Sequence, residues 1–138
     1  MKTTISTLFL LLSIVSYSNR IDFFEGSHEA AFEKAQVEGK LVFVDFYASW
    51  CKPCKQLEKS TFKNKKLSTF LNKNYINIKV NVEQPNPLFK ELMKGKLDVI
   101  PYLAIFSPKQ MQLGNLKGYV EAADLYDYVD NMKKSFEH

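Results

Sequence analysis

Hydrophobic residues are arranged in this chain as short continuous runs and as helical spacings. One run, Leu41–Tyr47, contains a single charge, Asp45, and stops at two small residues. A run of this kind is typical of a strand that is buried on both faces of a sheet. Two later runs, Tyr75–Val82 and Tyr102–Phe106, are rich in β-branched and aromatic residues and predict two more strands. A turn after the last of these predicts a hairpin that returns along Met111–Lys117.

Helical spacing lies between these runs. Ser27 offers an N-cap and Gly39 a C-cap for the first helix. The spacings predict helices at Ser27–Glu38, from about Cys51 to Ser60, from Asn64 through Leu71, at Leu88–Met93 and at Glu121–Lys134. With a short apolar edge strand at Ile21–Phe24, the predicted order is βαβαβαββα. This order predicts an α/β fold with a mixed central sheet covered by helices on both faces. Right-handed crossovers would make the strands around the second helix parallel.

The first eighteen residues follow a different pattern. Lys2 gives a positive start, Leu8–Val15 an apolar core, and Ser16–Ser18 a possible cleavage region. This is typical of a secretory signal peptide, so residues 1–18 are predicted to be a signal peptide and residues 19–138 one domain. The apolar part is shorter than the roughly 20 residues that a transmembrane helix needs. An uncleaved amino-terminal anchor is the alternative.

The candidate chemistry lies directly after the first predicted strand, at Cys51-Lys52-Pro53-Cys54. These are the only two cysteines of the chain, whereas an exported protein that used disulfides for structure would carry more. Two intervening residues place both sulfurs on one helical turn, close enough to bridge. A helix N-terminus favours a thiolate, so Cys51 is expected to be the exposed nucleophile with a lowered pKa. Cys54, one turn further on, is expected to be buried and to resolve the mixed disulfide. A purely structural local bridge is the alternative.

These residues belong to a longer stretch, Asp45–Lys55, that resembles the active-site segment of thioredoxins. Lys79–Pro87 is similar to the strand and loop after that family's second helix, and Val99–Phe106 to its cis-proline strand. Gly118 and the following helix resemble the closing element, so the similarity covers roughly residues 24–129. The stretches Thr61-Phe62 with Asn64, and Leu71–Lys73, look closest to the exported group that includes the carboxy-terminal domain of the transmembrane thiol reductase. The resemblance therefore implies a thioredoxin fold.

The resemblance also implies roles for charged residues. A carboxylate in a buried strand is costly, so burial should raise the pKa of Asp45. The matching aspartate of thioredoxins lies under the disulfide and moves protons to and from the inner cysteine. An aspartate turned to solvent at the strand's end is the alternative for Asp45. Lys79 matches a lysine of the neighbouring strand that can pair with this aspartate, and an exposed strand lysine is its alternative. Lys52 adds positive charge beside Cys51, and Pro53 stiffens the start of the helix.

Three further residues are expected to form the substrate-binding surface. Trp50 resembles a tryptophan that shields the edge of the active site, and core packing is its alternative role. Pro101 resembles the cis-proline opposite the disulfide. The backbone of Ile100 would then pair with an extended substrate segment.

Charge and the remaining residues add little to this interpretation. The formal net charge is +4, and the lysines at 63, 65, 66 and 73 are interpreted as a solvated helix face. No nucleic-acid motif accompanies them. A metal site is disfavoured because His28 and His138 lie far from the cysteines in sequence. No cofactor beyond the redox-active disulfide is expected.

The sequence therefore predicts an exported thiol–disulfide oxidoreductase without metal, acting as a monomer on protein disulfides or dithiols. Asp45, Pro53 and the absence of a histidine between the cysteines favour reduction as the direction. A membrane or soluble thiol donor would supply the electrons. The alternatives are a disulfide isomerase or oxidase, and a non-catalytic thioredoxin-fold binding module or chaperone.

Overall fold

Four strands form the central sheet, in the order β2-β1-β3-β4. The computed structural model describes residues 19–94 and 97–138, so the predicted signal peptide lies outside the described residues. The strands are β1 (Leu41–Tyr47), β2 (Tyr75–Asn81), β3 (Tyr102–Phe106) and β4 (Gln112–Lys117). β1 pairs with β2 in parallel and with β3 antiparallel, and β4 is antiparallel to β3. The predicted mixed sheet is therefore confirmed.

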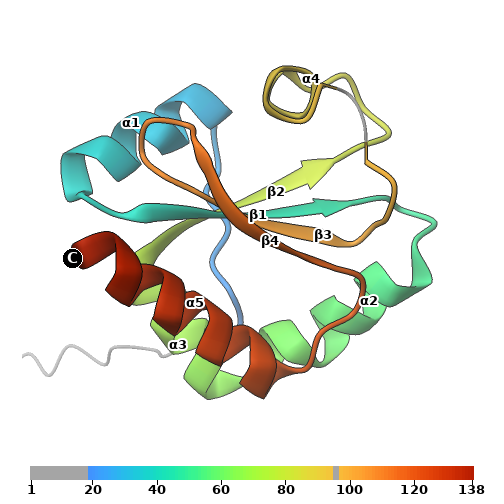
Figure 1. The fold of residues 1–138 in the computed structure, drawn as a ribbon. Coiled ribbons are helices and arrows are strands. Elements are labelled where there is room, and N and C mark those ends of the chain that lie inside the picture. Colours follow the sequence, from blue (N-terminus) through green and yellow to red (C-terminus); the bar gives the residue numbers. More distant parts are fainter. Residues whose placement is uncertain (1–18, 95–96) are drawn as a thin grey trace, which may run out of the picture.

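Helices cover both faces of this sheet (Figure 1). They are α1 (His28–Glu38), α2 (Lys52–Lys59), α3 (Lys65–Asn74), α4 (Pro87–Leu92) and α5 (Ala122–Glu137), with a 3-10 turn at Thr61–Lys63. The predicted caps are present, since Ser27 accepts a hydrogen bond from the Ala30 amide and Gly39 has φ of 64°. Asn64 likewise accepts from the Leu67 amide and starts α3. No helix within residues 19–94 and 97–138 is long and apolar enough to cross a bilayer.

One predicted strand is wrong. Ile21–Phe24 does not form an edge strand, because only a single bridge joins Phe23 to Asn77 of β2. The Phe24 amide donates one backbone hydrogen bond to the Asn77 carbonyl, at 2.7 Å. A strand needs a partner over several residues, and apolar character alone cannot supply that pairing.

The alternating side chains of β1 divide the core into two layers. Val42, Val44 and Phe46 face α1 and α4. Leu41 and Phe43 face the opposite side, where they pack with residues of α2, α3 and α5. Asp45 shares the parity of Leu41 and Phe43 and is therefore on the α2 face of the sheet. This placement brings a carboxyl group to the side of the sheet that carries the cysteines.

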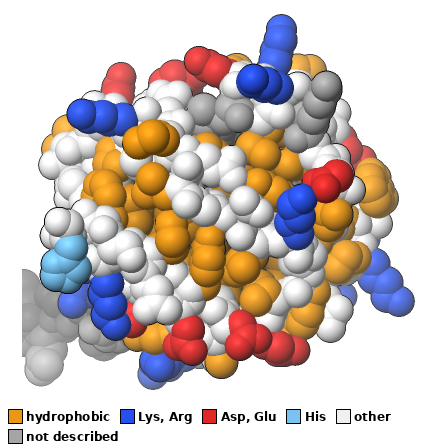
Figure 2. All heavy atoms as spheres, in the orientation of Figure 1, with side chains coloured by type: hydrophobic (Ala, Val, Ile, Leu, Met, Phe, Trp, Pro, Cys, Tyr) orange, Lys and Arg blue, Asp and Glu red, His pale blue; other side chains and the backbone are white. Residues whose placement is uncertain are grey.

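The edge strand β4 leaves some apolar surface accessible. Leu113 of β4 is exposed, and so is Met111, which directly precedes the strand. In the orientation of Figure 1, hydrophobic side chains spread across the middle of the visible face and charged ones lie mostly toward its rim (Figure 2).

Candidate functional site

The two cysteines are joined in a disulfide at the start of α2. Cys51 is the N-cap residue, and its sulfur accepts a hydrogen bond from the Cys54 amide at 3.2 Å. Their Cα atoms are 5.3 Å apart, as expected for two residues on one helical turn. Pro53 lies in the first turn of α2, where its missing N–H has no helical partner to lose. The structure therefore shows the predicted bridge, with Cys51 at the helix terminus and Cys54 inside the first turn.

The expectation that Cys51 is exposed is wrong for this disulfide form. Cys51 is 2% exposed and Cys54 4%. Both pack with Ala48, and Tyr47, Val82 and Ile100 contact this small cluster. Neighbours from other elements cover the helix terminus, which the local sequence around the motif does not reveal.

Asp45 is buried on the α2 face, with 2% of its surface exposed. Its Oδ1 atom has no hydrogen-bond partner among the described residues. Burial raises the pKa of Asp45 from 3.8 to about 7, while the positive charge of Lys79 acts in the opposite direction. A carboxyl group with a pKa near neutrality can both take up and release a proton under physiological conditions.

Lys79 lies directly across from Asp45 in the register of β1 and β2, but its ion pair is with another residue. The Lys79 ammonium binds the carboxylate of Glu58 on α2 and lies 4.3 Å from the centre of the Tyr47 ring. The expected pairing of Lys79 with Asp45 is therefore limited to a through-space charge effect. Sequence reasoning missed Glu58, although its position four residues after Cys54 indicates the same side of α2.

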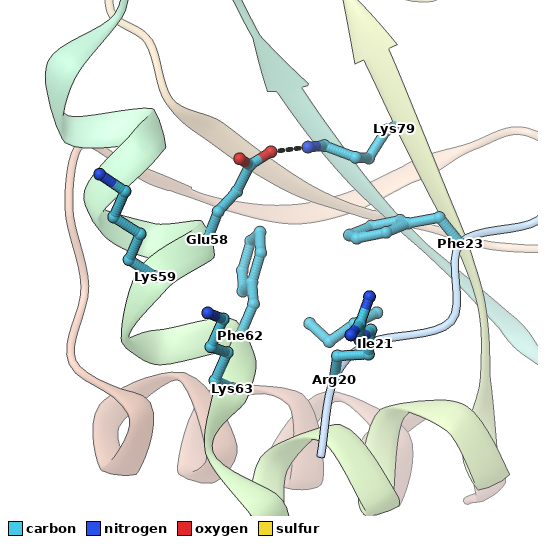
Figure 3. A pocket seen from close by; sticks show the side chains of 8 residues that line it. All are labelled: Arg20, Ile21, Phe23, Glu58, Lys59, Phe62, Lys63 and Lys79. Carbon is cyan, nitrogen blue, oxygen red and sulfur yellow. Dashed lines mark hydrogen bonds and ion pairs between the residues drawn. The ribbon is translucent and has the colours of Figure 1, made fainter. Parts of the chain in front are cut away.

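The Glu58–Lys79 pair lies at one end of a cleft of about 400 Å³ between α2, β2 and the amino-terminal segment (Figure 3). Ile21, Phe23 and Phe62 supply its apolar wall. Three cations also line it: Arg20, Lys59 and Lys63.

The residues predicted to bind substrate are Trp50, Ile100 and Pro101. Trp50 is 69% exposed, so core packing does not account for it. The Ile100–Pro101 peptide bond is cis, as the resemblance implies. The Pro101 carbonyl accepts a hydrogen bond from the Gly118 amide at 2.8 Å, whereas Ile100 makes no backbone hydrogen bond within residues 19–94 and 97–138. Ile100 therefore combines a side chain against the cysteines with a backbone available for pairing.

A second acidic residue that sequence reasoning missed holds the loop before the cysteines. The Glu83 carboxylate accepts hydrogen bonds from the Ser49 amide at 2.8 Å and from the Ser49 hydroxyl at 2.7 Å. These bonds lower the pKa of Glu83. Glu83 follows β2, so this contact ties the end of that strand to the loop that carries Trp50 and Cys51. No short-range pattern links residues 34 positions apart.

Metal chemistry has no support from the donor set. Within residues 19–94 and 97–138, no group of three or more His, Cys, Asp or Glu side chains could hold a metal ion. His28 is the first residue of α1 and His138 follows α5, and neither joins the cysteine cluster. The redox group of the site is the Cys51–Cys54 disulfide itself.

A family model for the thioredoxin-like domain matches residues 28–133. The chain is also similar to the thiol:disulfide interchange protein DsbD of Salmonella typhi, with 34% identity over 92 residues. This match covers 64% of the chain and 16% of that relative. The DsbD protein of Yersinia pestis strain Pestoides F is 31% identical over 101 residues, which cover 70% of the chain and 17% of the relative. The chain thus spans less than a fifth of the length of these relatives.

Solved structures show the same fold. A solution structure from Bacteroides thetaiotaomicron, assigned as a disulphide-isomerase, has a TM-score of 0.69 and 31% identity, and the match covers 80% of this chain and 91% of that one. A thioredoxin from Thermus thermophilus has a TM-score of 0.69 and 19% identity over 82% of this chain and 87% of its own. The oxidised DsbD carboxy-terminal domain of Neisseria meningitidis has a TM-score of 0.59 and 24% identity, with 75% and 90% covered.

Proposed function

Because the chain belongs to the thioredoxin-like domain family, we propose that it reduces protein disulfides outside the cytoplasm through Cys51 and Cys54. The chain is a thiol–disulfide oxidoreductase whose redox group is this cysteine pair. The observation that carries the proposal is the bonded pair at the start of α2 on the sheet face that buries Asp45. We propose the reductive direction of the exchange, protein disulfides as its substrates and a compartment outside the cytoplasm.

The first step is attack by Cys51. In the reduced protein, the Cys51 thiolate attacks one sulfur of the substrate disulfide, forms a mixed disulfide and releases one substrate thiolate. The start of α2 stabilises this thiolate, because its free amides and dipole favour negative charge. Lys52, the first residue of α2, places a positive charge beside it.

The second step is resolution by Cys54. Its thiol transfers a proton to the Asp45 carboxylate, and the resulting thiolate attacks the Cys51 sulfur. The substrate leaves with its second sulfur as a thiolate, and the Cys51–Cys54 disulfide of the structure is regenerated. Two electrons have then passed from the protein to the substrate, and a dithiol donor must supply two more for another cycle.

Trp50, Ile100 and Pro101 are the proposed contacts for substrate. An extended segment next to the substrate disulfide would pair with the backbone N–H and C=O groups of Ile100. The exposed Trp50 would cover one edge of the bound segment. The substrates are accordingly protein segments rather than small cofactors.

Reduction is favoured as the direction by three features of the sequence. Asp45 supplies a base for Cys54, Pro53 stiffens the motif, and no histidine lies between the cysteines. Disulfide isomerisation is the second candidate, since the Bacteroides thetaiotaomicron structure, at 31% identity, is assigned to that activity.

The reduction potential of the Cys51–Cys54 couple tests the direction. Equilibration with glutathione or dithiothreitol buffers, followed by the fluorescence of Trp50, the single tryptophan, gives its midpoint. We expect a value more negative than the roughly −180 mV of protein disulfide isomerase, toward the roughly −270 mV of thioredoxin. A midpoint near −180 mV would favour isomerisation, and one near −120 mV would assign the domain to oxidation.

Export is proposed from the sequence pattern of residues 1–18, with residues 19–138 as the mature domain. Expression of the full chain in a bacterial host should give a mature protein that begins near residue 19, as measured by intact mass after osmotic release. A cytosolic product that retains Met1 would contradict export. An intact chain in the membrane fraction would favour the alternative of an uncleaved anchor.

The proposed electron donor is a membrane-bound or soluble dithiol protein, and the domain is proposed to act as a monomer.

A further inference from the structure

The helices that follow the disulfide carry an unusual concentration of positive charge. Seven lysines and a single acidic residue, Glu58, lie between positions 52 and 73, whereas acidic residues outnumber basic ones over the rest of residues 19–138. Glu58 is bound to Lys79 of β2. None of the seven lysines forms an ion pair with a described residue. The basic charge of this region is therefore not neutralised within the described part of the chain.

Three of these lysines form a ridge that begins at the disulfide. Lys52, Lys55 and Lys59 are spaced three and four residues apart on α2 and share one face of the helix. All three are exposed, and the first directly follows the N-cap residue Cys51. We call Lys52, Lys55 and Lys59 the lysine ridge. A protein that presents a disulfide to Cys51 therefore comes close to Lys52, at the near end of this ridge.

Folding stability does not account for this placement. The first turns of α2 and α3 contain no acidic residue, and lysines occupy the first position of α2 and the first two of α3. The helix dipole disfavours cations there. Like charges three and four residues apart also repel each other. Within the ridge, Lys52 opposes the dipole at the first position of α2, whereas Lys59 lies in the last turn, where the dipole favours a cation. The unfavourable position of Lys52, directly beside Cys51, points to a role in interaction.

We propose that the lysine ridge docks an acidic protein partner whose disulfide or dithiol then exchanges with Cys51. This proposal rests on the proposed function and names a substrate class for the same site. Complementary charge at the rim of an interface mainly accelerates association and weakens with salt. Partners with acidic side chains beside their cysteines react faster than partners with basic side chains there.

The composition of α2 favours a protein over a lipid surface as the occupant. A helix that lies on a membrane needs an exposed apolar face beside its cations. The apolar residues of α2, Cys54 and Leu57, are buried against the sheet. The exposed residues of this helix are lysines, Pro53, Gln56 and Glu58, which suit a polar, acidic surface.

The test uses three synthetic peptides of equal length, each with one internal disulfide flanked by glutamate, glutamine or lysine residues. Second-order rate constants for their reduction by the reduced protein are followed by Trp50 fluorescence at about 20 mM and about 500 mM salt. We expect the acidic peptide to react at least about 10-fold faster than the basic one at low salt. The ratio should approach 1 at high salt, because the Debye length falls well below 10 Å.

Matched charge reversals localise the effect. The double variant Lys55→Glu, Lys59→Glu should invert the preference while it leaves the rate with the glutamine peptide within about twofold. The control Lys65→Glu, Lys73→Glu makes the same charge change on α3 and should retain a preference for the acidic peptide. If both variants lose the preference for the acidic peptide equally, the preference depends on the net charge of the protein. The assignment to the lysine ridge would then be overturned.

Two further outcomes separate the proposals. If wild type reduces all three peptides at equal rates, acidic docking is rejected and the proposed reduction stands. If none of the peptides is reduced, the proposed function itself fails.

Vesicles of phosphatidylcholine with phosphatidylglycerol test the lipid alternative. Binding that the ridge variant loses, without any peptide preference in wild type, would replace the acidic partner with an anionic membrane.

Discussion

Replacement of Cys51 by serine is expected to abolish the catalysis of insulin reduction by dithiothreitol that we expect of this protein. Without the Cys51 thiolate no mixed disulfide is expected to form, because the remaining Cys54 lies inside the first turn of α2 and lacks the N-cap position that stabilises a thiolate. Cys54→Ser should behave differently, since attack is retained and resolution is lost. It should accumulate a covalent adduct with its substrate, detectable by intact mass and reversed by excess dithiothreitol. Insulin turbidity gives the rate for both variants.

The fold of both variants provides the control. A bridge that closes over two intervening residues removes little chain entropy from the unfolded state, so both variants should remain folded by circular dichroism. A folded Cys51→Ser protein that still prevents aggregation of clients, without reducing them, would identify a chaperone or binding module. Retained reductase activity in Cys51→Ser would instead contradict the role given to this cysteine.

The parts of the fold that the sequence predicts well are those determined by local pattern. β1 and β3 have the predicted bounds because each is a continuous apolar run, and both occupy the centre of the sheet. Ser27 and Asn64 cap their helices as expected because capping involves atoms only three residues apart. The burial of Asp45 agrees with its place inside an apolar run, and the alternative of an aspartate turned to solvent at the strand's end is wrong.

The parts that the sequence did not predict depend on contacts between distant residues. Glu58 reaches Lys79 across 21 positions, and Glu83 reaches Ser49 across 34. Both acids are exposed residues of ordinary composition, so nothing local distinguishes them from solvated charges. The burial of Cys51 has the same origin, because Val82 and Ile100 come from other elements. Motif resemblance predicts the reacting atoms, and the tertiary structure shows their surroundings.

Asp45→Asn is expected to raise the stability of the oxidised protein, and the gain should depend on pH. The pKa of Asp45 is about 7 in the folded protein and near 3.8 without burial. Below about pH 4 both states carry the proton, so the acid and its amide should be nearly equal in stability. Between about pH 4 and pH 7 the Asp45 carboxyl group keeps its proton in the folded state and has lost it in the unfolded state. The free energy of unfolding of wild type therefore falls as pH rises through this range. Asparagine avoids this loss, which amounts to at most about 4 kcal/mol above pH 7.

The same substitution is expected to slow resolution of the mixed disulfide. General acid–base catalysis contributes typically 10²–10⁴-fold, which sets the upper limit for Asp45. The rate of resolution in wild type should rise through about pH 7 as Asp45 loses its proton and becomes a base. Asp45→Asn should lack this rise. Attack by Cys51 should change much less, because its thiolate depends mainly on the helix terminus and on Lys52.

Two measurements on Asp45→Asn separate a proton carrier from a structural residue. Stopped-flow single turnovers with a disulfide peptide, from pH 5 to pH 9, resolve attack from resolution, and urea melts at pH 4 and pH 8 give the stability change. A proton carrier predicts a slow, pH-independent resolution step in a protein that is more stable at pH 8 than wild type. Unchanged resolution combined with a large loss of stability would mean that Asp45 acts as a structural partner of Lys79, its neighbour on β2. The charge effect of Lys79 on Asp45 would then stabilise the sheet rather than tune a base, and proton transfer from Cys54 would have to proceed through water.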